Sequence, residues 1–231
     1  MTQPIVLIPG LLVSPRYYAP LLPALWQFGS VTIAHHTSDD SMAAIAARIV
    51  AAAPPRFALA GHSMGGYIAF EIMRQAGARV TKLALMDTAA RADTPEQSER
   101  RRAQIALAQG GRFAEIPDLQ FPQLVHPSRH GDAALREEIR RMADDVGAAA
   151  FVRQQTAIMQ RPDSRPGLAA IGCPTLVLVG DGDVLTPPER AREIAQGIAG
   201  AREVTIDGSG HMTAMEAPAA TMEALVEWLR A

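Results

Sequence analysis

Residues 57–67 read Phe-Ala-Leu-Ala-Gly-His-Ser-Met-Gly-Gly-Tyr, a short apolar run followed by a serine between closely spaced glycines. The run before Gly61 has the length and composition of a buried strand, and the residues after Gly65 have the spacing of a helix. A serine at such a sharp turn takes a strained backbone conformation, and glycine two residues before and two after it lets the neighbouring chain pass close by. The pattern predicts that the hydroxyl of Ser63 stands clear of a sheet as a candidate nucleophile.

Similar apolar runs recur along the chain and predict an α/β protein. The runs are rich in Val, Ile or Leu, and most are followed by a segment with helical spacing, which is typical of βα units with a parallel sheet. The predicted strands are Ile5–Ile8, Val31–His35, Phe57–Ala60, Lys82–Met86, Thr175–Val179 and Glu203–Ile206. The predicted helices between them are Ser41–Ala53, Gly66–Gln75, Pro188–Ile198 and Ala219–Leu229. We expect a mostly parallel, twisted sheet of about six strands flanked by helices.

The alternation fails once, between residues 87 and 168. Helical patterns fill this part of the chain, and no convincing strand occurs in it. The helical patterns are Pro95–Gln109, Asp132–Asp145 and Ala148–Met159, separated by Pro117, Pro122, Pro127 and Pro162. We therefore predict that residues 89–168 form a helical lid, inserted into a core made of residues 1–88 and 169–231.

A carboxylate partner for the serine is expected at the carboxyl end of a later strand. The strand that ends near Gly180 is followed by Asp181 and Asp183, and we assign the role to Asp183 because Asp181, between two glycines, suits a turn. Asp87 is the rival, since it follows the strand that ends at Met86. Its other interpretation is a cap for the first helix of the lid.

The base is expected after the acid in chain order. His211 lies on a loop of small residues just after the last predicted strand, which fits that expectation. For the other histidines a surface or structural role is expected, although the two in the lid have the alternative of reaching substrate from above. These other histidines are His35, His36, His62, His126 and His130.

The order Ser63, Asp183, His211 on strands of this kind resembles the α/β-hydrolase family, specifically its small lidded esterase, lactonase and C–C hydrolase branch. The resemblance spans nearly the whole chain. It implies an oxyanion hole made by the backbone N–H groups of Met64 and Leu11. The chain departs from the family twice: Pro9-Gly10 stands where members usually carry His-Gly, and the two antiparallel strands that usually come first have no room before Ile5.

Apolar side chains flank the candidate catalytic residues and suggest a pocket for aliphatic acyl or alcohol groups. Leu12, Met64 and Met212 adjoin Leu11, Ser63 and His211 in the sequence, and the alternative is that the methionines fill the core. Tyr17 is a further candidate for contact with substrate, with packing of the loop that follows Leu11 as the alternative.

An arginine run in the lid has two interpretations. Arg100, Arg101 and Arg102 could form an anion site, but Glu96 and Glu99 lie nearby in the sequence. We expect a solvated helix face on which these charges balance.

Composition excludes several classes of function. The net charge of −2 over 231 residues and a pI near 6.3 provide no extended field to attract nucleic acid or anionic lipid. The apolar stretch Ile5–Val13 lacks a preceding Lys or Arg and is interrupted by Pro9 and Gly10, so we interpret it as a strand rather than a signal sequence. Cys173 is the only cysteine, which excludes an intramolecular disulfide. A cytoplasmic protein that contacts neither nucleic acid nor membrane is expected, and the oligomeric state is left open.

The resemblance implies a serine hydrolase that cleaves carboxylic esters, small-molecule or polymeric, through an acyl-enzyme, without a metal or other cofactor. A lactonase, a thioesterase, a C–C bond hydrolase and a haloperoxidase-like esterase share this machinery and stay open. A dehalogenase is disfavoured because that chemistry requires Asp where Ser63 stands. A protein of the same fold that only binds a small ligand is the alternative of another class, and the presence of Ser63, Asp183 and His211 together argues against it.

Overall fold

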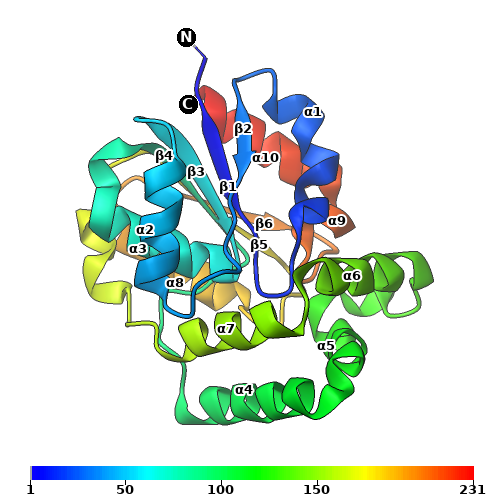
Figure 1. The fold of residues 1–231 in the computed structure, drawn as a ribbon. Coiled ribbons are helices and arrows are strands. Elements are labelled where there is room, and N and C mark those ends of the chain that lie inside the picture. Colours follow the sequence, from blue (N-terminus) through cyan, green and yellow to red (C-terminus); the bar gives the residue numbers. More distant parts are fainter. Residues whose placement is uncertain (1) are drawn as a thin grey trace.

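A computed structural model describes residues 2–231, and a single six-stranded sheet lies at its centre (Figure 1). All five neighbouring strand pairs are parallel, and the order across the sheet is β2-β1-β3-β4-β5-β6. The strands are β1 (Ile5–Ile8), β2 (Val31–Ile33), β3 (Phe57–His62), β4 (Val80–Met86), β5 (Thr175–Gly180) and β6 (Arg202–Ile206). The expected α/β class with about six strands is confirmed.

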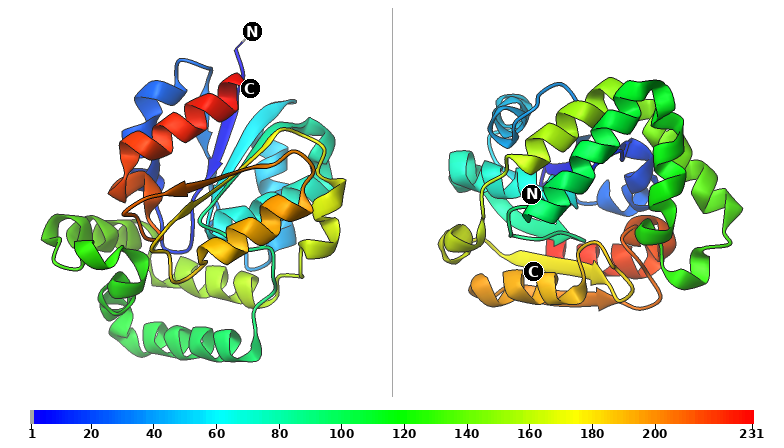
Figure 2. Two further views of the ribbon diagram at one scale, coloured as in Figure 1. Left: turned by 180° about the vertical axis from the view of Figure 1, so that it is seen from behind. Right: turned by 90° about the horizontal axis from the view of Figure 1, so that it is seen from below.

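Helices cover both faces of the sheet because both faces are apolar. Alternate residues of a strand point to opposite faces, so Val6 and Ile8 pack into one buried cluster while Ile5 and Leu7 pack into another. The first cluster lies beneath α2 (Met42–Ala52), α3 (Met64–Ala76) and α8 (Pro188–Gly197), and the second beneath α1 (Leu22–Leu25) and α10 (Pro218–Arg230). The two layers are seen from behind in the left panel of Figure 2.

The strand boundaries differ from expectation where pairing decides them. β2 ends at Ile33 rather than His35 because it is an edge strand, and its ladder with β1 ends at the pair Leu7 and Ile33. β3 continues to His62 rather than Ala60 because it is paired on both sides almost to its end. β3 therefore delivers its last residue directly to Ser63.

The helices begin and end close to the predicted residues. Ser41 caps α2, since its side-chain oxygen accepts a hydrogen bond from the backbone N–H of Ala44. α3 begins at Met64, two residues earlier than predicted, so that the serine itself precedes the helix. α9 (Thr213–Glu216) is a single turn that was not predicted.

The segment between β4 and β5 is helical. Its helices are α4 (Pro95–Leu107), α5 (Ile116–Leu124), α6 (Ala133–Val146) and α7 (Ala148–Met159). α5 corrects the interpretation of Pro117 and Pro122 as separators: Pro117 lies in the first turn, where a missing N–H costs nothing, and Pro122 lies inside this short helix. In Figure 1 these helices lie below the lower, carboxyl ends of the strands, and the right panel of Figure 2 shows α4 and α7 crossing over them. That residues 89–168 act as a lid stays a prediction.

No helix within residues 2–231 combines the length and apolarity needed to cross a membrane.

Candidate active site

Ser63 lies in the sharp turn between β3 and α3. Its backbone has φ 53° and ψ −114°, a conformation that non-glycine residues rarely adopt. The glycines around it allow close packing: a Cβ on Gly61 would overlap the carbonyl of Gly65, and a Cβ on Gly65 would overlap the carbonyl of Ile8. Strain of this kind persists only where the surrounding structure enforces it, and it concentrates at functional sites.

Two hydrogen bonds join Ser63 to His211 and Asp183. His211 Nε2 lies 2.8 Å from Ser63 Oγ, and His211 Nδ1 lies 2.7 Å from Asp183 Oδ2. Asp183 follows β5 and His211 follows β6, so the three side chains come from the carboxyl ends of β3, β5 and β6. The structure brings together the three residues that the sequence singled out, in the arrangement of nucleophile, base and orienting acid.

The surroundings of Asp183 keep it ionised. Oδ1 accepts hydrogen bonds from the backbone N–H groups of Leu185 and Thr186, and Oδ2 accepts one from the Thr186 hydroxyl. Burial alone would raise the pKa of Asp183, but the neighbouring imidazole and these donors lower it below its usual value. Burial likewise opposes a charge on His211, yet the adjacent Asp183 carboxylate raises its pKa above 6.5.

Asp87, the rival acid, is fully buried at the end of β4 but makes no hydrogen bond to His211 among the described residues. Its Oδ1 accepts from the backbone N–H of Gly180, and its Oδ2 accepts from the Thr213 hydroxyl at 2.6 Å. Burial, together with the nearby Asp183 carboxylate, raises its pKa well above the usual value. The contacts of Asp87 therefore join the ends of β4 and β5 to α9.

The predicted oxyanion donors lie on two segments that meet beside Ser63. Met64 is the first residue of α3, and an N–H in this position has no acceptor within its own helix. Leu11 belongs to the loop after β1, and within residues 2–231 its N–H donates to no acceptor. The loop passes so close that a Cβ on Gly10 would stand 3.1 Å from that of Ser63.

Two buried side chains hold this loop on either side of Leu11: His36, for which a surface or structural role was expected, and Gln154, which sequence reasoning missed. His36 Nε2 lies 2.9 Å from the carbonyl oxygen of Gly10, and burial lowers the pKa of His36 to about 4, so its ring is neutral at pH 7 and donates N–H to that oxygen. Gln154 of α7 accepts the backbone N–H of Leu12 through Oε1 at 3.2 Å. Leu12 has φ 57°, so the loop is strained as well as tethered. Nothing in the local pattern around either side chain indicated these contacts.

A second missed residue, Glu216 of α9, fixes the loop that carries His211. Its Oε1 accepts the backbone N–H groups of Gly210 and Met212, and its Oε2 accepts that of His126 at 2.7 Å. The backbone N–H of His211 also donates to the carbonyl of Leu124, at the end of α5. The histidine loop is thus bound to the helical segment over the sheet. The acid five residues after His211 was the only sequence signal.

Ser63 and His211 line a cavity of about 660 Å³. Met212 lines it as expected, but Leu12 lines only a much smaller hollow beside it. Tyr17 does not line the cavity: it is fully buried, it stacks on His62 with ring centroids 4.1 Å apart, and its hydroxyl is 3.3 Å from that of Thr213. Tyr17 therefore packs against the end of β3 and against α9. Met64 is likewise fully buried in the core.

The cavity is less apolar than expected because arginines line it. Arg100 and Arg101 both do so. Arg100 is exposed, as expected for a solvated helix face, whereas Arg101 is half-buried and departs from that expectation. Arg101 is held there by Asp93, whose Oδ2 accepts from its Nε at 2.6 Å. Arg102 is exposed and lies outside the lining.

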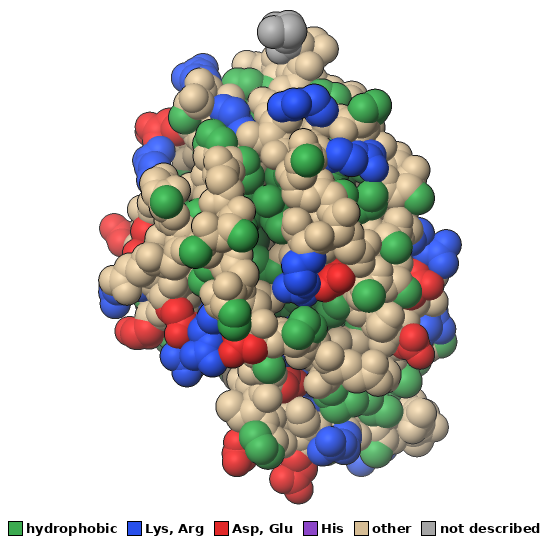
Figure 3. All heavy atoms as spheres, turned by 90° about the vertical axis from the view of Figure 1, so that its left-hand side faces the viewer, with side chains coloured by type: hydrophobic (Ala, Val, Ile, Leu, Met, Phe, Trp, Pro, Cys, Tyr) green, Lys and Arg blue, Asp and Glu red, His purple; other side chains and the backbone are tan. Residues whose placement is uncertain are grey.

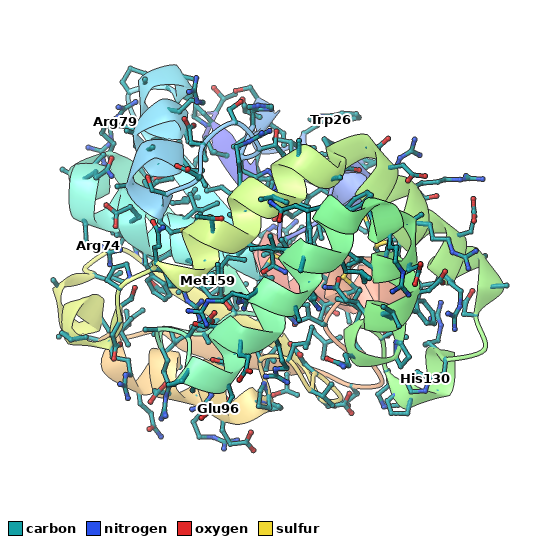
Figure 4. The ribbon with its side chains drawn as sticks, turned by 60° about the horizontal axis from the view of Figure 1, so that its bottom comes forward. Trp26, Arg74, Arg79, Glu96, His130 and Met159 are labelled. Carbon is teal, nitrogen blue, oxygen red and sulfur yellow. The ribbon has the colours of Figure 1, made fainter. Side chains whose placement is uncertain are left out.

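The two histidines of the inserted segment do not line the cavity. His126 packs against Gly182, where an added Cβ would overlap its ring, and His130 is exposed, with Nε2 3.0 Å from the carbonyl oxygen of Pro122. Figure 4 labels His130 at the lower right edge of the molecule, away from Met159 at the end of α7, which lies nearer the centre of the view. Among residues 2–231, no group of three or more His, Cys, Asp or Glu side chains could hold a metal ion.

Comparison with known proteins finds the same architecture. The family model described as "Alpha/beta hydrolase family" matches residues 5–224. A thermophilic esterase from Thermogutta terrifontis superposes with a TM-score of 0.90 at 29% identity, covering 100% of this chain and 90% of the esterase. The AB hydrolase superfamily protein YisY of Bacillus subtilis is 34% identical over 66% of this chain, which spans only 59% of that relative. A pimeloyl-[acyl-carrier protein] methyl ester esterase of Xanthomonas campestris is 26% identical, covering 90% of this chain and 87% of the esterase.

Proposed function

The chain belongs to the alpha/beta hydrolase family, and from that premise we propose that it is a carboxylesterase with Ser63 as nucleophile, His211 as base and Asp183 as orienting acid. One observation carries the proposal: a chain of hydrogen bonds runs from Ser63 Oγ through His211 to Asp183. Its Ser63 end lines a cavity large enough for a small organic molecule.

The geometry supports the following sequence of steps. His211 Nε2 accepts the hydroxyl proton while Ser63 Oγ attacks the acyl carbon, and the carbonyl oxygen takes up negative charge between the N–H groups of Leu11 and Met64. The C–O bond to the alcohol breaks, and His211 returns the proton to the leaving alkoxide. Water then attacks the acyl-enzyme, again giving its proton to His211, and the acid is released with Ser63 restored.

The relatives support an ester as the bond that is cleaved. The names of two of them, the Thermogutta esterase and the methyl ester esterase, state ester hydrolysis for those proteins. Lactones, thioesters and activated C–C bonds present the same acyl carbon to the nucleophile, so they are the alternatives within this mechanism. A protein that only binds a ligand would need none of the strain at Ser63.

Labelling with a fluorophosphonate probe tests the nucleophile. We expect the probe to label the protein and a Ser98→Ala variant, whose changed serine lies on α4, but not Ser63→Ala. Equal labelling of Ser63→Ala, or no labelling of any form, would contradict the proposal.

A hydrolysis screen tests which type of bond the protein cleaves. We expect turnover of p-nitrophenyl esters above that of matched lactones and thioesters, and its loss in Ser63→Ala. If a lactone or thioester were preferred, Ser63 would still be the nucleophile, but the ester would be wrong as the substrate class.

A further inference from the structure

The cavity beside Ser63 carries an excess of positive charge. Five arginines are among its lining residues, and neither Asp nor Glu is. The arginines are Arg91, Arg100, Arg101, Arg161 and Arg190. On the outer face that Figure 3 shows, by contrast, acidic and basic side chains are interspersed.

Two of the five arginines are occupied by the protein itself. Arg101 and Arg161 share the buried carboxylate of Asp93, each with a nitrogen 2.6 Å from one of its oxygens. Arg161 also lies over the ring of Tyr67, with its guanidinium carbon 4.1 Å from the ring centroid. One carboxylate facing two guanidiniums leaves this wall of the cavity positive.

A third arginine, Arg91, is paired outside the cavity. Its guanidinium donates to both oxygens of Glu193, and Arg165 lies 3.7 Å from the same carboxylate. Glu193 is therefore shared between two arginines.

The remaining two arginines, Arg100 of α4 and Arg190 of α8, form no ion pair or side-chain hydrogen bond within residues 2–231. Each of these arginines lowers the pKa of a carboxyl group about one turn away on its own helix, Arg100 that of Glu96 and Arg190 that of Glu193. Arg100 is exposed and Arg190 half-buried, and both line the cavity without a protein acceptor for their guanidinium groups. Guanidinium groups bind carboxylate and phosphate oxygens through paired hydrogen bonds.

We propose that the substrate carries, besides the bond that is cleaved, an oxyanionic group, carboxylate or phosphate, that binds Arg100 and Arg190. This inference rests on the proposed ester hydrolysis and adds a substrate class to it: hemiesters of dicarboxylic acids and comparable anionic esters. The scissile carbonyl lies at Ser63, while the anion lies between the inserted segment and the start of α8.

Paired substrates test the proposal. Mono-p-nitrophenyl glutarate and p-nitrophenyl pentanoate have acyl chains of similar length, but only the first carries a charge. We expect the ratio of their kcat/KM values to favour the anionic ester and to fall about tenfold in Arg100→Gln and in Arg190→Gln, mainly through KM, since one charged hydrogen bond of this kind corresponds to about that factor. Arg102→Gln, on the same helix but outside the lining, is the matched control and should leave the ratio unchanged.

A second measurement is independent of turnover. Ser63→Ala is titrated calorimetrically with glutarate and with inorganic phosphate, and the stronger ligand identifies the oxyanion. We expect this binding to weaken when Arg190→Gln is added and when salt is raised. Efficient hydrolysis of the neutral ester, with a ratio near one that neither substitution changes, would overturn the anion site while leaving the esterase proposal intact. If the fluorophosphonate probe did not label the protein but the anion still bound, the esterase proposal would fail and the anion site would stand.

Discussion

Replacing Asp183 by Asn should nearly abolish turnover without removing the side chain. In the native site all four partners of this carboxylate are donors: two backbone N–H groups at Oδ1, and the Thr186 hydroxyl and His211 Nδ1 at Oδ2. An amide has one oxygen and one NH₂ group. If its oxygen keeps the two backbone donors, the NH₂ group faces His211 Nδ1, which must then accept.

That exchange fixes the wrong tautomer of the imidazole. A His211 that accepts at Nδ1 carries its proton on Nε2, so it cannot take the proton of Ser63. The expected loss is about 10⁴-fold in kcat, or roughly 5 kcal/mol of transition-state stabilisation. The measurement is steady-state hydrolysis of a p-nitrophenyl ester, with fluorophosphonate labelling rate as an independent readout.

Asp87→Asn provides the matched comparison. Its amide oxygen can keep the bond from the backbone N–H of Gly180, and its NH₂ group can donate to the Thr213 hydroxyl, which then turns its own proton to the Tyr17 hydroxyl 3.3 Å away. Burial disfavours the charged form of Asp87, whose pKa it raises, and the substituted amide carries no charge. We expect less than about a tenfold loss in kcat. Full activity in Asp183→Asn beside a large loss in Asp87→Asn would refute the assignment.

Three further predictions concern the base, the oxyanion loop and the turn. Because the pKa of His211 is raised, kcat/KM should fall as pH drops, with a midpoint above 6.5, and a profile with its midpoint below 6.5 would contradict this. Gln154→Leu removes the acceptor of the Leu12 N–H. We expect kcat to fall about tenfold while KM changes little, and an unchanged kcat would exclude a positioning role. Gly65→Ala forces a Cβ onto backbone and should cost about 3 kcal/mol in urea unfolding, whereas Gly172→Ala, with open space, should cost little; equal midpoints would refute the packing argument.

The sequence alone was sufficient for the parts of this protein that local rules govern. The length of the apolar runs, and their alternation with segments of helical spacing, located the six strands to within about two residues. The glycines at positions 61 and 65 singled out Ser63 because close backbone passage there excludes any side chain. These signals lie within about ten residues of one another, so no knowledge of distant packing was needed.

Tertiary structure alone decided which distant groups meet. Asp87 and Asp183 both follow strands, and only the positions of β4 and β5 relative to His211 give its hydrogen bond to Asp183. The tethers from Gln154 and the direction of Arg100 depend on how α4 and α7 lie over the sheet. Asp183 and His211 are 28 positions apart and Leu12 and Gln154 are 142 apart, while the direction of Arg100 depends on the rotation of its helix. A local pattern of sequence specifies neither a distant contact nor a helix rotation.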